Sequence, residues 1–444
     1  MKLNQFNNYT GEAIIYKETS YGFQDLLDQI SRNKVKLKSY INQNDVVIVD
    51  SDYSFYSISL LLALSDFACI IVPIVRTTDA EFDAKQKASE ANLKIILNND
   101  TFQIIALKKH KSNYDEYLNI TSLDKSGIVL FSSGTTGVPK VMVHNFSKLI
   151  QSFDPPRQQR KLRFLLFLMF DHIGGLNTLL NCLNNGMPII IPERRSPADI
   201  LNLIAKNNIN ILPTTPTFLN MMLISDDFKM YDISSLKMIT YGTERMPNEL
   251  LRKIHSLLPK VKLLQTFGTS ETGILRTKSK SSSSLYFKIV DEDVDYKIEE
   301  DQLFIRSKTS VNGYKDSSSN QFTEDGWFAT GDIVKLDEEG YMKVEGRLNN
   351  VINVGGLKVL PAEVEDVISA VSGVVDATVF SRDNAITGQM VVARVIVGKS
   401  FDKTLIKNKI KHVCKVELDK YKRPMKIEVS DELKITPRFK KVNK

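Results

Sequence analysis

The stretch that decides the fold is Leu130-Phe131-Ser132-Ser133-Gly134-Thr135-Thr136-Gly137-Val138-Pro139-Lys140. It follows an apolar run, residues 128–131, that predicts a buried strand. Two glycines let the backbone bend tightly around an anion, and four hydroxyls and a lysine add donors to the same small volume. The order is not that of a Walker loop, because Pro139 stands five residues after Gly134. The run predicts a polyphosphate-binding loop, against the alternative of a Ser/Gly-rich surface turn.

The composition indicates a soluble globular protein. The chain has 444 residues, of which 42% are hydrophobic, so it can bury a large core in about two to four domains. Cys69, Cys182 and Cys414 lack C-x-x-C spacing, which indicates a reducing compartment and no zinc site. The first residues lack the apolar segment typical of a secretory signal. We therefore expect a cytoplasmic protein.

One stretch, residues 57–75 (SISLLLALSDFACIIVPIV), is apolar enough to be mistaken for a membrane span. Asp66 lies near its centre and Pro73 near its end, and both argue against a span. We expect a buried helix followed by a strand instead, and no membrane span.

The formal net charge of +7 is concentrated at the C-terminal end. Residues 402–444 hold 14 Lys and Arg against 6 Asp and Glu, so the preceding chain is close to neutral. The positive charge of this segment forms either a solvated basic face or a surface that attracts an acidic partner or a polyphosphate. We expect no nucleic-acid partner.

Short β-rich runs alternate with helical segments in the first part of the chain. Residues 45–50 (DVVIVD) and 93–97 (LKIIL) predict strands and residues 56–64 predict a helix, which is an α/β pattern. Residues before 128 contain no cluster of chemistry-bearing side chains, and we interpret them as scaffold. Residues 278–284 (KSKSSSS) predict a mobile surface loop.

Polar residues follow several further predicted strands. His172 lies between the apolar residues 164–170 and a Gly-Gly pair, where it is either a core residue or a functional one. Residues 209–212 and 238–241 predict strands, and Gly242 after the second would let a flat ligand approach the backbone closely. Residues 261–264 predict a strand that runs into QTFGTSETG, whose aromatic ring, hydroxyls and carboxylate suit a base and a hard metal near phosphate.

Two later turns carry single charged residues. Asp332 ends the run GWFATGD, where its carboxylate could accept both hydroxyls of a ribose. Arg347 follows residues 341–345 and supplies a bidentate cation. Single Asp and Arg residues in turns are usually structural, so these two carry weight only together with the other runs.

Taken together and in this order, the runs from residue 128 to the end resemble the adenylate-forming superfamily of acyl-CoA synthetases, peptide-synthetase adenylation domains and luciferases. The resemblance implies an α/β fold with a large N-terminal domain of layered α/β subdomains, residues 1–346. It further implies a hinge at 347–350, containing Asn349, and a small mobile α+β C-terminal domain, residues 351–444. By the same resemblance His172 lies between the acyl pocket and the thiol tunnel.

The resemblance also assigns the nucleotide contacts. Glu271 binds Mg²⁺ and counts, with Thr135, among the catalytic residues. Asp332 holds the ribose, and Arg347 reaches ribose or phosphate. The phosphate loop comprises Ser132, Ser133, Gly134, Thr135, Thr136, Gly137 and Lys140; the adenine is bordered by Gly242, Thr243, Glu244, Gln265, Thr266, Phe267, Gly268, Thr269 and Ser270; and Lys358 completes the set.

Three positions depart from the family pattern. Asn349 stands where Asp or Lys is usual, and Phe267 stands where Tyr is commoner, which keeps the stacking face. The catalytic lysine usually lies in T-x-x-G-K, and this chain has T-P-R-F-K-K, with Phe439 in place of the glycine. Spacing favours Lys440, and Lys441 is the alternative.

The implied reaction is ATP-dependent activation of a small carboxylic acid to an acyl-adenylate, with release of pyrophosphate, followed by thioester formation with CoA. A second reading is a stand-alone adenylation enzyme that loads an acyl or aminoacyl group onto the phosphopantetheine of a carrier protein. A third is a catalytically degenerate nucleotide-binding protein, to which Asn349 and Phe439 point. The expected cofactors are ATP, Mg²⁺, and CoA or carrier-protein phosphopantetheine, and the acid can be fatty, aryl or amino.

Overall fold

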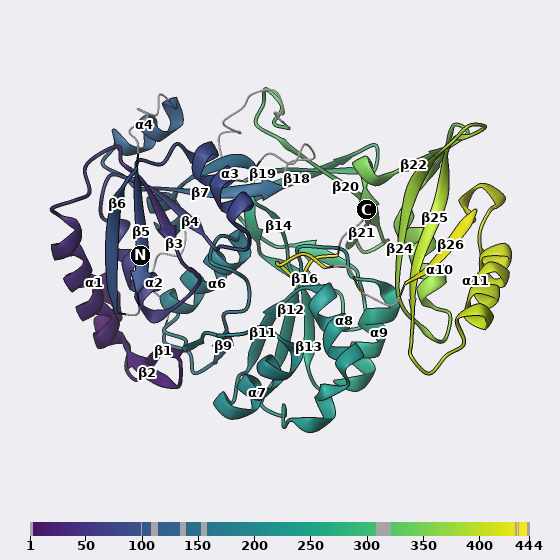
Figure 1. Ribbon diagram of the computed structural model, residues 1–444, viewed down its shortest axis with the longest axis horizontal. Coiled ribbons are helices and arrows are strands. Elements are labelled where there is room, and N and C mark those ends of the chain that lie inside the picture. Colours follow the sequence, from purple (N-terminus) through teal and green to yellow (C-terminus); the bar gives the residue numbers. More distant parts are fainter. Residues whose placement is uncertain are drawn as a thin grey trace.

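The computed structural model describes residues 3–98, 100–107, 114–133, 139–151, 158–307, 321–430, 433 and 435–441. Its first two sheets carry the α/β layers, a third sheet is antiparallel, and a small α+β unit follows (Figure 1). This arrangement confirms the predicted fold class.

The first sheet has six strands, and its inner strands are nearly continuous Val and Ile runs because both faces are covered. Four strands are parallel, and the two edge strands are antiparallel to their neighbours. The order is β6 (Thr101–Ala106), β5 (Leu93–Asn98), β3 (Val46–Asp50), β4 (Ile70–Ile74), β7 (Gly127–Ser133) and β8 (Pro139–Asn145). The helices of this part are α1 (Phe23–Leu37), α2 (Phe55–Leu64), α3 (Asp79–Ser89), α4 (Asp115–Thr121) and α5 (Phe146–Gln151).

Helix α2 explains the apolar stretch that resembles a membrane span. Nearly all of its residues are buried in the core, and Ser54 caps its first turn by accepting the Ser57 N–H. Strand β4 follows at Ile70–Ile74, so the prediction of a buried helix and a strand is confirmed. Within the described ranges, no helix is both long and apolar enough to cross a membrane.

The second sheet has seven strands and positions the site. Its order is β13 (Lys262–Gln265), β12 (Met238–Tyr241), β11 (Ile211–Thr214), β9 (Phe164–Leu165), β10 (Ile189–Ile190), β1 (Glu12–Tyr16) and β2 (Thr19–Gly22). The helices along it are α6 (Ile173–Asn184), α7 (Pro197–Asn207), α8 (Pro216–Ser225) and α9 (Asn248–Leu257). Because β11, β12 and β13 are parallel, their carboxyl ends meet at one edge, where open α/β sheets bind ligands.

A third, antiparallel sheet and a short hairpin follow. The hairpin pairs β14 (Phe267–Thr269) with β15 (Gly273–Leu275). The sheet runs β16 (Thr277–Ser279), β17 (Phe287–Ile289), β21 (Met342–Arg347), β20 (Phe328–Leu336), β19 (Gln302–Ser307) and β18 (Val294–Glu299). The prediction of a loop at 278–284 is therefore wrong at its start, since β16 pairs with β17 and Lys280 forms ion pairs with Asp337 and Glu339.

The C-terminal unit has its own sheet and core. It contains β22 (Ile352–Val354), β23 (Leu357–Val359), β24 (Val374–Asn384), β25 (Gly388–Val397) and β26 (Lys426–Ser430), with α10 (Pro361–Ser369) and α11 (Lys403–Glu417). Asp366 of α10 pairs with Arg245 and accepts from Asn248 Nδ2 at 2.8 Å, so this unit contacts the N-terminal part beside α9. Short 3-10 turns, η1 (Leu3–Asn8), η2 (Asp227–Met230), η4 (Leu348–Asn350) and η5 (Lys420–Lys422), complete the described elements.

The last described residues return to the middle of the molecule. Figure 1 shows the yellow C-terminal segment leaving the C-terminal unit and passing toward the strands of the second sheet. Ile435 and Lys441 form an antiparallel bridge, so residues 435–441 make a small hairpin. We call this hairpin the tail.

Candidate active site

A cavity of about 1860 Å³ lies at the carboxyl ends of β11, β12 and β13. Further walls come from helices α3, α6, α8 and α9, the β14–β15 hairpin, strands β20 and β21, the tail, and α10, β24 and β25 of the C-terminal unit. It brings together most of the predicted site residues: Lys140, His172, Gly242, Thr243, Glu244, Gln265, Thr266, Phe267, Gly268, Thr269, Ser270, Glu271, Asp332, Arg347, Asn349, Lys440 and Lys441.

The predicted phosphate loop is described only at its ends. Strand β7 ends at Ser133 and β8 begins at Pro139, and Lys140 of β8 lines the cavity. Gly134, Thr135, Thr136 and Gly137 lie outside the described residues, as do the side chains of Ser132 and Ser133. The strand before the loop and its position at the cavity agree with the prediction, and the loop's contacts stay a prediction.

The end of β12 is tightly packed. A Cβ on Gly242 would lie 2.4 Å from Thr266 Oγ1, so a glycine is needed here to make room for Thr266. The sequence had suggested only that it makes room for a ligand. Thr243 adopts a left-handed φ of +70°, which is strained for a β-branched residue. Its buried hydroxyl has no hydrogen-bond partner in the described part of the chain. Such strain is typical of functional sites.

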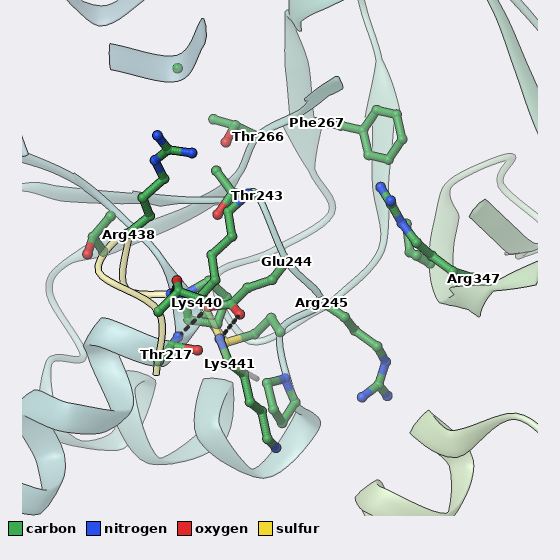
Figure 2. A pocket seen from close by; sticks show the side chains of 18 of the residues that line it. Thr217, Thr243, Glu244, Arg245, Thr266, Phe267, Arg347, Arg438, Lys440 and Lys441 are labelled. Carbon is green, nitrogen blue, oxygen red and sulfur yellow. Dashed lines mark hydrogen bonds between the residues drawn. The ribbon is translucent and has the colours of Figure 1, made fainter. Parts of the chain in front are cut away.

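Glu244 connects this strand end to the tail. Its carboxylate accepts the Thr217 N–H at 2.8 Å and the Lys441 N–H at 3.2 Å (Figure 2). Burial raises the pKa of Glu244, and these hydrogen bonds and the charge of Lys440 oppose the rise. A residue predicted to border the adenine therefore also holds the tail in place.

The β14–β15 hairpin presents an aromatic face and a carboxylate. The Phe267 ring stacks on Phe287 with centroids 5.6 Å apart, and both Phe267 and Glu271 line the cavity. The Thr269 hydroxyl accepts the N–H groups of Glu271 and Thr272, each at 3.2 Å, which fixes the turn. The hairpin thus provides a stacking surface and a hard oxygen ligand a few residues apart.

Asp332 and Arg347 form an ion pair across β20 and β21. Arg347 Nε lies 3.1 Å from Asp332 Oδ1, and the two residues are paired in the strand register. Burial raises the pKa of Asp332, Arg347 lowers it, and the nearby charge of Glu271 raises it further. The arrangement holds an oriented carboxylate beside a cation that is 60% exposed.

His172 begins α6 as its N-cap. Its Nδ1 accepts the Gly174 N–H at 3.0 Å, so in the neutral ring the proton is assigned to Nε2. Burial, with the positive charges of Lys440 and Arg438, lowers the pKa of His172 to about 3. The imidazole is therefore uncharged at neutral pH and lines the cavity as a neutral donor.

The tail separates the two candidate lysines. Figure 2 shows Lys440 extending toward Thr243 and Lys441 pointing the opposite way. Lys441 Nζ lies 2.9 Å from Asp376 of the C-terminal unit and also contacts the Ala377 carbonyl. Burial lowers the pKa of Lys440, while Glu244 opposes and Arg347 adds to that effect. Lys440 lines the cavity and forms no ion pair within the described ranges.

Sequence reasoning missed a charged cluster at one end of the cavity. Asp171 Oδ2 contacts Lys85 at 2.9 Å and Arg438 of the tail at 2.6 Å, and Glu81 contacts the same two cations. Lys85 and Asp171 are almost completely buried. Glu81 and Lys85 of α3 also line the cavity, and the interpretation of residues before 128 as scaffold stays a prediction. A Glu and a Lys four residues apart were the only signal, and such pairs are common on solvated helices.

Two other predicted site residues lie in or next to the C-terminal unit, apart from most of the residues predicted to bind the nucleotide. Lys358 is exposed on β23 and does not line the cavity. Asn349 lies in η4 between the two units and touches the cavity from that side. Their assigned roles stay predictions.

The fold and the cavity define a class: an α/β protein with a large cavity at the carboxyl edge of a parallel sheet and a small C-terminal unit that contributes to the walls of that cavity. Residues 45–302 match the AMP-binding enzyme family, and residues 363–440 match the AMP-binding enzyme C-terminal domain. The chain belongs to this family and, with it, to the adenylate-forming superfamily.

Curated relatives agree with this assignment. The chain is 28% identical to 4-coumarate–CoA ligase 5 of Oryza sativa over 345 residues, 71% of this chain and 64% of that protein. It is 28% identical to indoleacetate–CoA ligase of Aromatoleum aromaticum over 328 residues, 69% of this chain and again 64% of that protein. The chain thus spans 64% of the length of these two relatives.

Solved structures agree with the fold over almost the whole chain. The anthranilate CoA ligase AuaEII in complex with anthranoyl-AMP superimposes with a TM-score of 0.80 at 17% identity, covering 99% of this chain and 95% of that one. ATP-bound MatB from Rhodopseudomonas palustris gives a TM-score of 0.80 at 19% identity, covering 99% and 97%. At these identities the likeness shows the fold alone.

Proposed function

We propose that this protein is an AMP-forming acid–thiol ligase that activates a small carboxylic acid with ATP and transfers the acyl group to CoA. The observation that carries the proposal is Lys440, which reaches the same cavity as Asp332, Arg347 and Glu271 although it lies near the end of the chain. Membership of the AMP-binding enzyme family and the names of the relatives, which are CoA ligases, support the same reaction.

In the first step, a carboxylate oxygen of the acid bonds to the α-phosphorus of ATP, and the bond from that phosphorus to the bridging oxygen of pyrophosphate breaks. Negative charge grows on the phosphate oxygens, and fixed cations in a cavity stabilise it. Lys440 supplies one such cation, and Lys140 and Arg347 line the same cavity. Asp332 accepts the ribose hydroxyls, and Phe267 stacks on the adenine.

Mg²⁺ fits the carboxylate of Glu271. The described residues hold no group of three or more metal-binding side chains, but magnesium in nucleotide sites needs only one or two carboxylates with phosphate oxygens. Glu271 and Asp332 both line the cavity and are close enough for their charges to interact. When bound, the ion neutralises charge on the phosphates, and Glu271 orients it.

The acid pocket draws on one face of the second sheet. Ile211 pairs with Met238, and Thr240 with Leu264, and alternate residues of neighbouring strands share a face. All four line the cavity. Helix α6 adds polar groups to the same cavity from one of its faces, at Asn177, Thr178 and Asn181. A broad apolar wall with hydrogen-bonding groups favours a compact acid with a polar substituent, such as a hydroxylated aryl acid, over an unbranched fatty acid.

In the second step, the thiol sulfur bonds to the acyl carbon, the bond from that carbon to the phosphate oxygen breaks, and AMP leaves with the electron pair. The thiol proton passes to water. Neutral His172 lines the boundary of the pocket and positions the acyl group. Rotation about residues 347–350 withdraws Lys440 and brings the exposed turn Gly355-Gly356 and Lys358 toward the thiol channel.

The thiol acceptor is CoA or a carrier protein, and the relatives favour CoA. Helix α11 carries five lysines and one glutamate, which suits either the phosphates of CoA or an acidic carrier protein. Thioester formation assayed with CoA and with a holo-carrier protein separates the two. A cytoplasmic location stays a prediction from the sparse cysteines.

The proposal is tested by measuring pyrophosphate and AMP release from ATP and Mg²⁺ with 4-coumarate, indoleacetate, 2-succinylbenzoate, octanoate and phenylalanine. We expect release that depends on one of these acids and gives a thioester when CoA is added. ATP binding with no pyrophosphate from any acid would instead support the degenerate nucleotide-binding protein. ADP as product would exclude the proposed reaction class.

A further inference from the structure

The tail contains a β-turn whose fourth residue is a phenylalanine and not the glycine that this position favours. Residues 436–439 form a β-turn in which the Phe439 N–H donates to the Thr436 carbonyl at 3.0 Å. Pro437 occupies the second position, which suits a type I turn, and glycine is favoured at the fourth. Here that residue is Phe439, with a left-handed φ of +54°. A phenylalanine in this conformation needs a compensating interaction elsewhere.

The compensating interaction is packing of the Phe439 ring against Phe167 and Phe218 of the N-terminal part. We call these two residues the aromatic slot. The Phe439 ring lies 5.3 Å from the ring of Phe167 and 5.3 Å from that of Phe218, centroid to centroid. Phe167 and Phe218 are themselves fully buried and 4.4 Å apart. The Phe439 ring therefore packs against the hydrophobic core of the second sheet and joins the tail to that core.

Polar contacts fix the tail on both sides of this ring. The Thr215 hydroxyl caps α8 by accepting the Phe218 N–H and donates to the Phe439 carbonyl at 2.7 Å. Arg438 pairs with Asp171, which directly precedes His172. Lys440 follows immediately, and its N–H donates to the Thr436 hydroxyl at 3.2 Å. The position of Lys440 in the cavity is thus set by the residues just before it.

We infer that Phe439 is a positioning residue: its ring, packed against both Phe167 and Phe218, holds Lys440 in the cavity for the adenylation step. The inference rests on the proposed function, in which Lys440 acts in that step only. Withdrawing the tail for thioester formation removes the ring from its slot and exposes apolar surface. Phe439 therefore favours the adenylation arrangement and opposes the second step.

The test compares Phe439→Gly with the wild type in the two half-reactions. Glycine fits the left-handed turn without strain, so this variant removes the ring and keeps the backbone. We expect roughly tenfold slower ATP–pyrophosphate exchange, supported by the first acid of the panel that works, because an aromatic contact of this size is worth about one factor of ten. CoA thioester formation from pre-made acyl-adenylate should be unchanged or faster.

Phe439→Ala loses the ring and keeps the strained φ, so its exchange should fall below that of Phe439→Gly. Met425→Ala, at an exposed residue between η5 and β26, is the matched control for apolar truncation in the C-terminal unit and should behave like the wild type. Exchange by Phe439→Gly at or above the wild-type rate would overturn the inference, as would equal loss of both half-reactions. A wild-type protein that exchanges pyrophosphate with no acid of the panel would instead contradict the proposed function.

Discussion

Neighbouring lysines in the tail meet opposite parts of the molecule. Both lysines line the cavity, but among the described residues Lys440 has no ion-pair partner, whereas Lys441 is paired with Asp376 in the C-terminal unit. Successive side chains of an extended segment point to opposite sides, so one residue of register separates the two environments. The comparison teaches that the tail is a bridge: the Lys440 side chain extends toward Thr243, and Lys441 ties the tail to the C-terminal unit.

The largest expected effect comes from removing the lysine on the cavity side. Lys440→Ala should slow acyl-adenylate formation by two or more orders of magnitude, because an oriented cation at developing phosphate charge is worth roughly 3 kcal/mol. Thioester formation from pre-made acyl-adenylate should survive, because in the proposed second step the tail is withdrawn. Separate assays of the two half-reactions measure this.

Lys441→Ala is the matched variant on the other side of the bridge. It removes the contact with Asp376 and leaves the cavity cation in place, so only a small loss in adenylation is expected. Selective loss of adenylation in Lys441→Ala, with Lys440→Ala near wild type, would move the catalytic assignment by one residue and break the comparison.

The charged cluster of Lys85, Asp171 and Arg438 allows a second comparison, in which a buried and an exposed ion pair are judged by the free energy of unfolding. Lys85→Met should lower the free energy of unfolding by about 2 kcal/mol, because it leaves the buried Asp171 carboxylate with Arg438 as its remaining cation. Urea unfolding measures the change. Lys206→Met, which breaks an exposed ion pair with Glu18, is the control and should change little. Equal losses in both variants would show that burial of the cluster does not matter.

Glu271→Gln tests the metal side of the cavity. The amide is a near-isostere but a poorer ligand for a hard cation, so activity at limiting Mg²⁺ should fall roughly tenfold while folding is retained. The measurement is a titration of pyrophosphate release against Mg²⁺ concentration, with thermal unfolding as the control. An unchanged Mg²⁺ dependence would remove Glu271 from the metal site.

The smallest expected change is at His172. Because burial lowers its pKa to about 3, the ring should stay neutral from pH 7.5 to pH 5, and its NMR signals should not move over that range. The unfolded chain takes up this proton below about pH 6.5, so this group lowers stability as the pH falls. His172→Gln assigns the signal. A midpoint between pH 6 and 7 would contradict the proposed environment.

The sequence predicted the parts of the site that follow directly from short runs. Phe267 and Glu271 lie in or beside one hairpin, and Asp332 and Arg347 are paired across neighbouring strands, so the family pattern was sufficient to find them. The prediction that Asp332 lies in a turn was wrong, since it lies in the middle of β20. The cluster of Lys85, Asp171 and Arg438 joins three distant segments and had no motif, so only the folded chain reveals it. The contacts of Phe439 with Phe167 and Phe218 could not be predicted for the same reason. The sequence showed only that Phe439 stands where the family pattern has glycine.

The central claim is that acid and ATP react directly to give an acyl-adenylate. The most direct measurement supplies the active acid with ¹⁸O in both carboxylate oxygens, together with ATP, Mg²⁺ and CoA, and analyses the AMP by mass spectrometry. The account predicts one ¹⁸O atom in each AMP formed, because the oxygen that attacks the α-phosphorus stays with AMP when the thiol takes the acyl group. AMP without label, or label found in inorganic phosphate beside ADP, would contradict it.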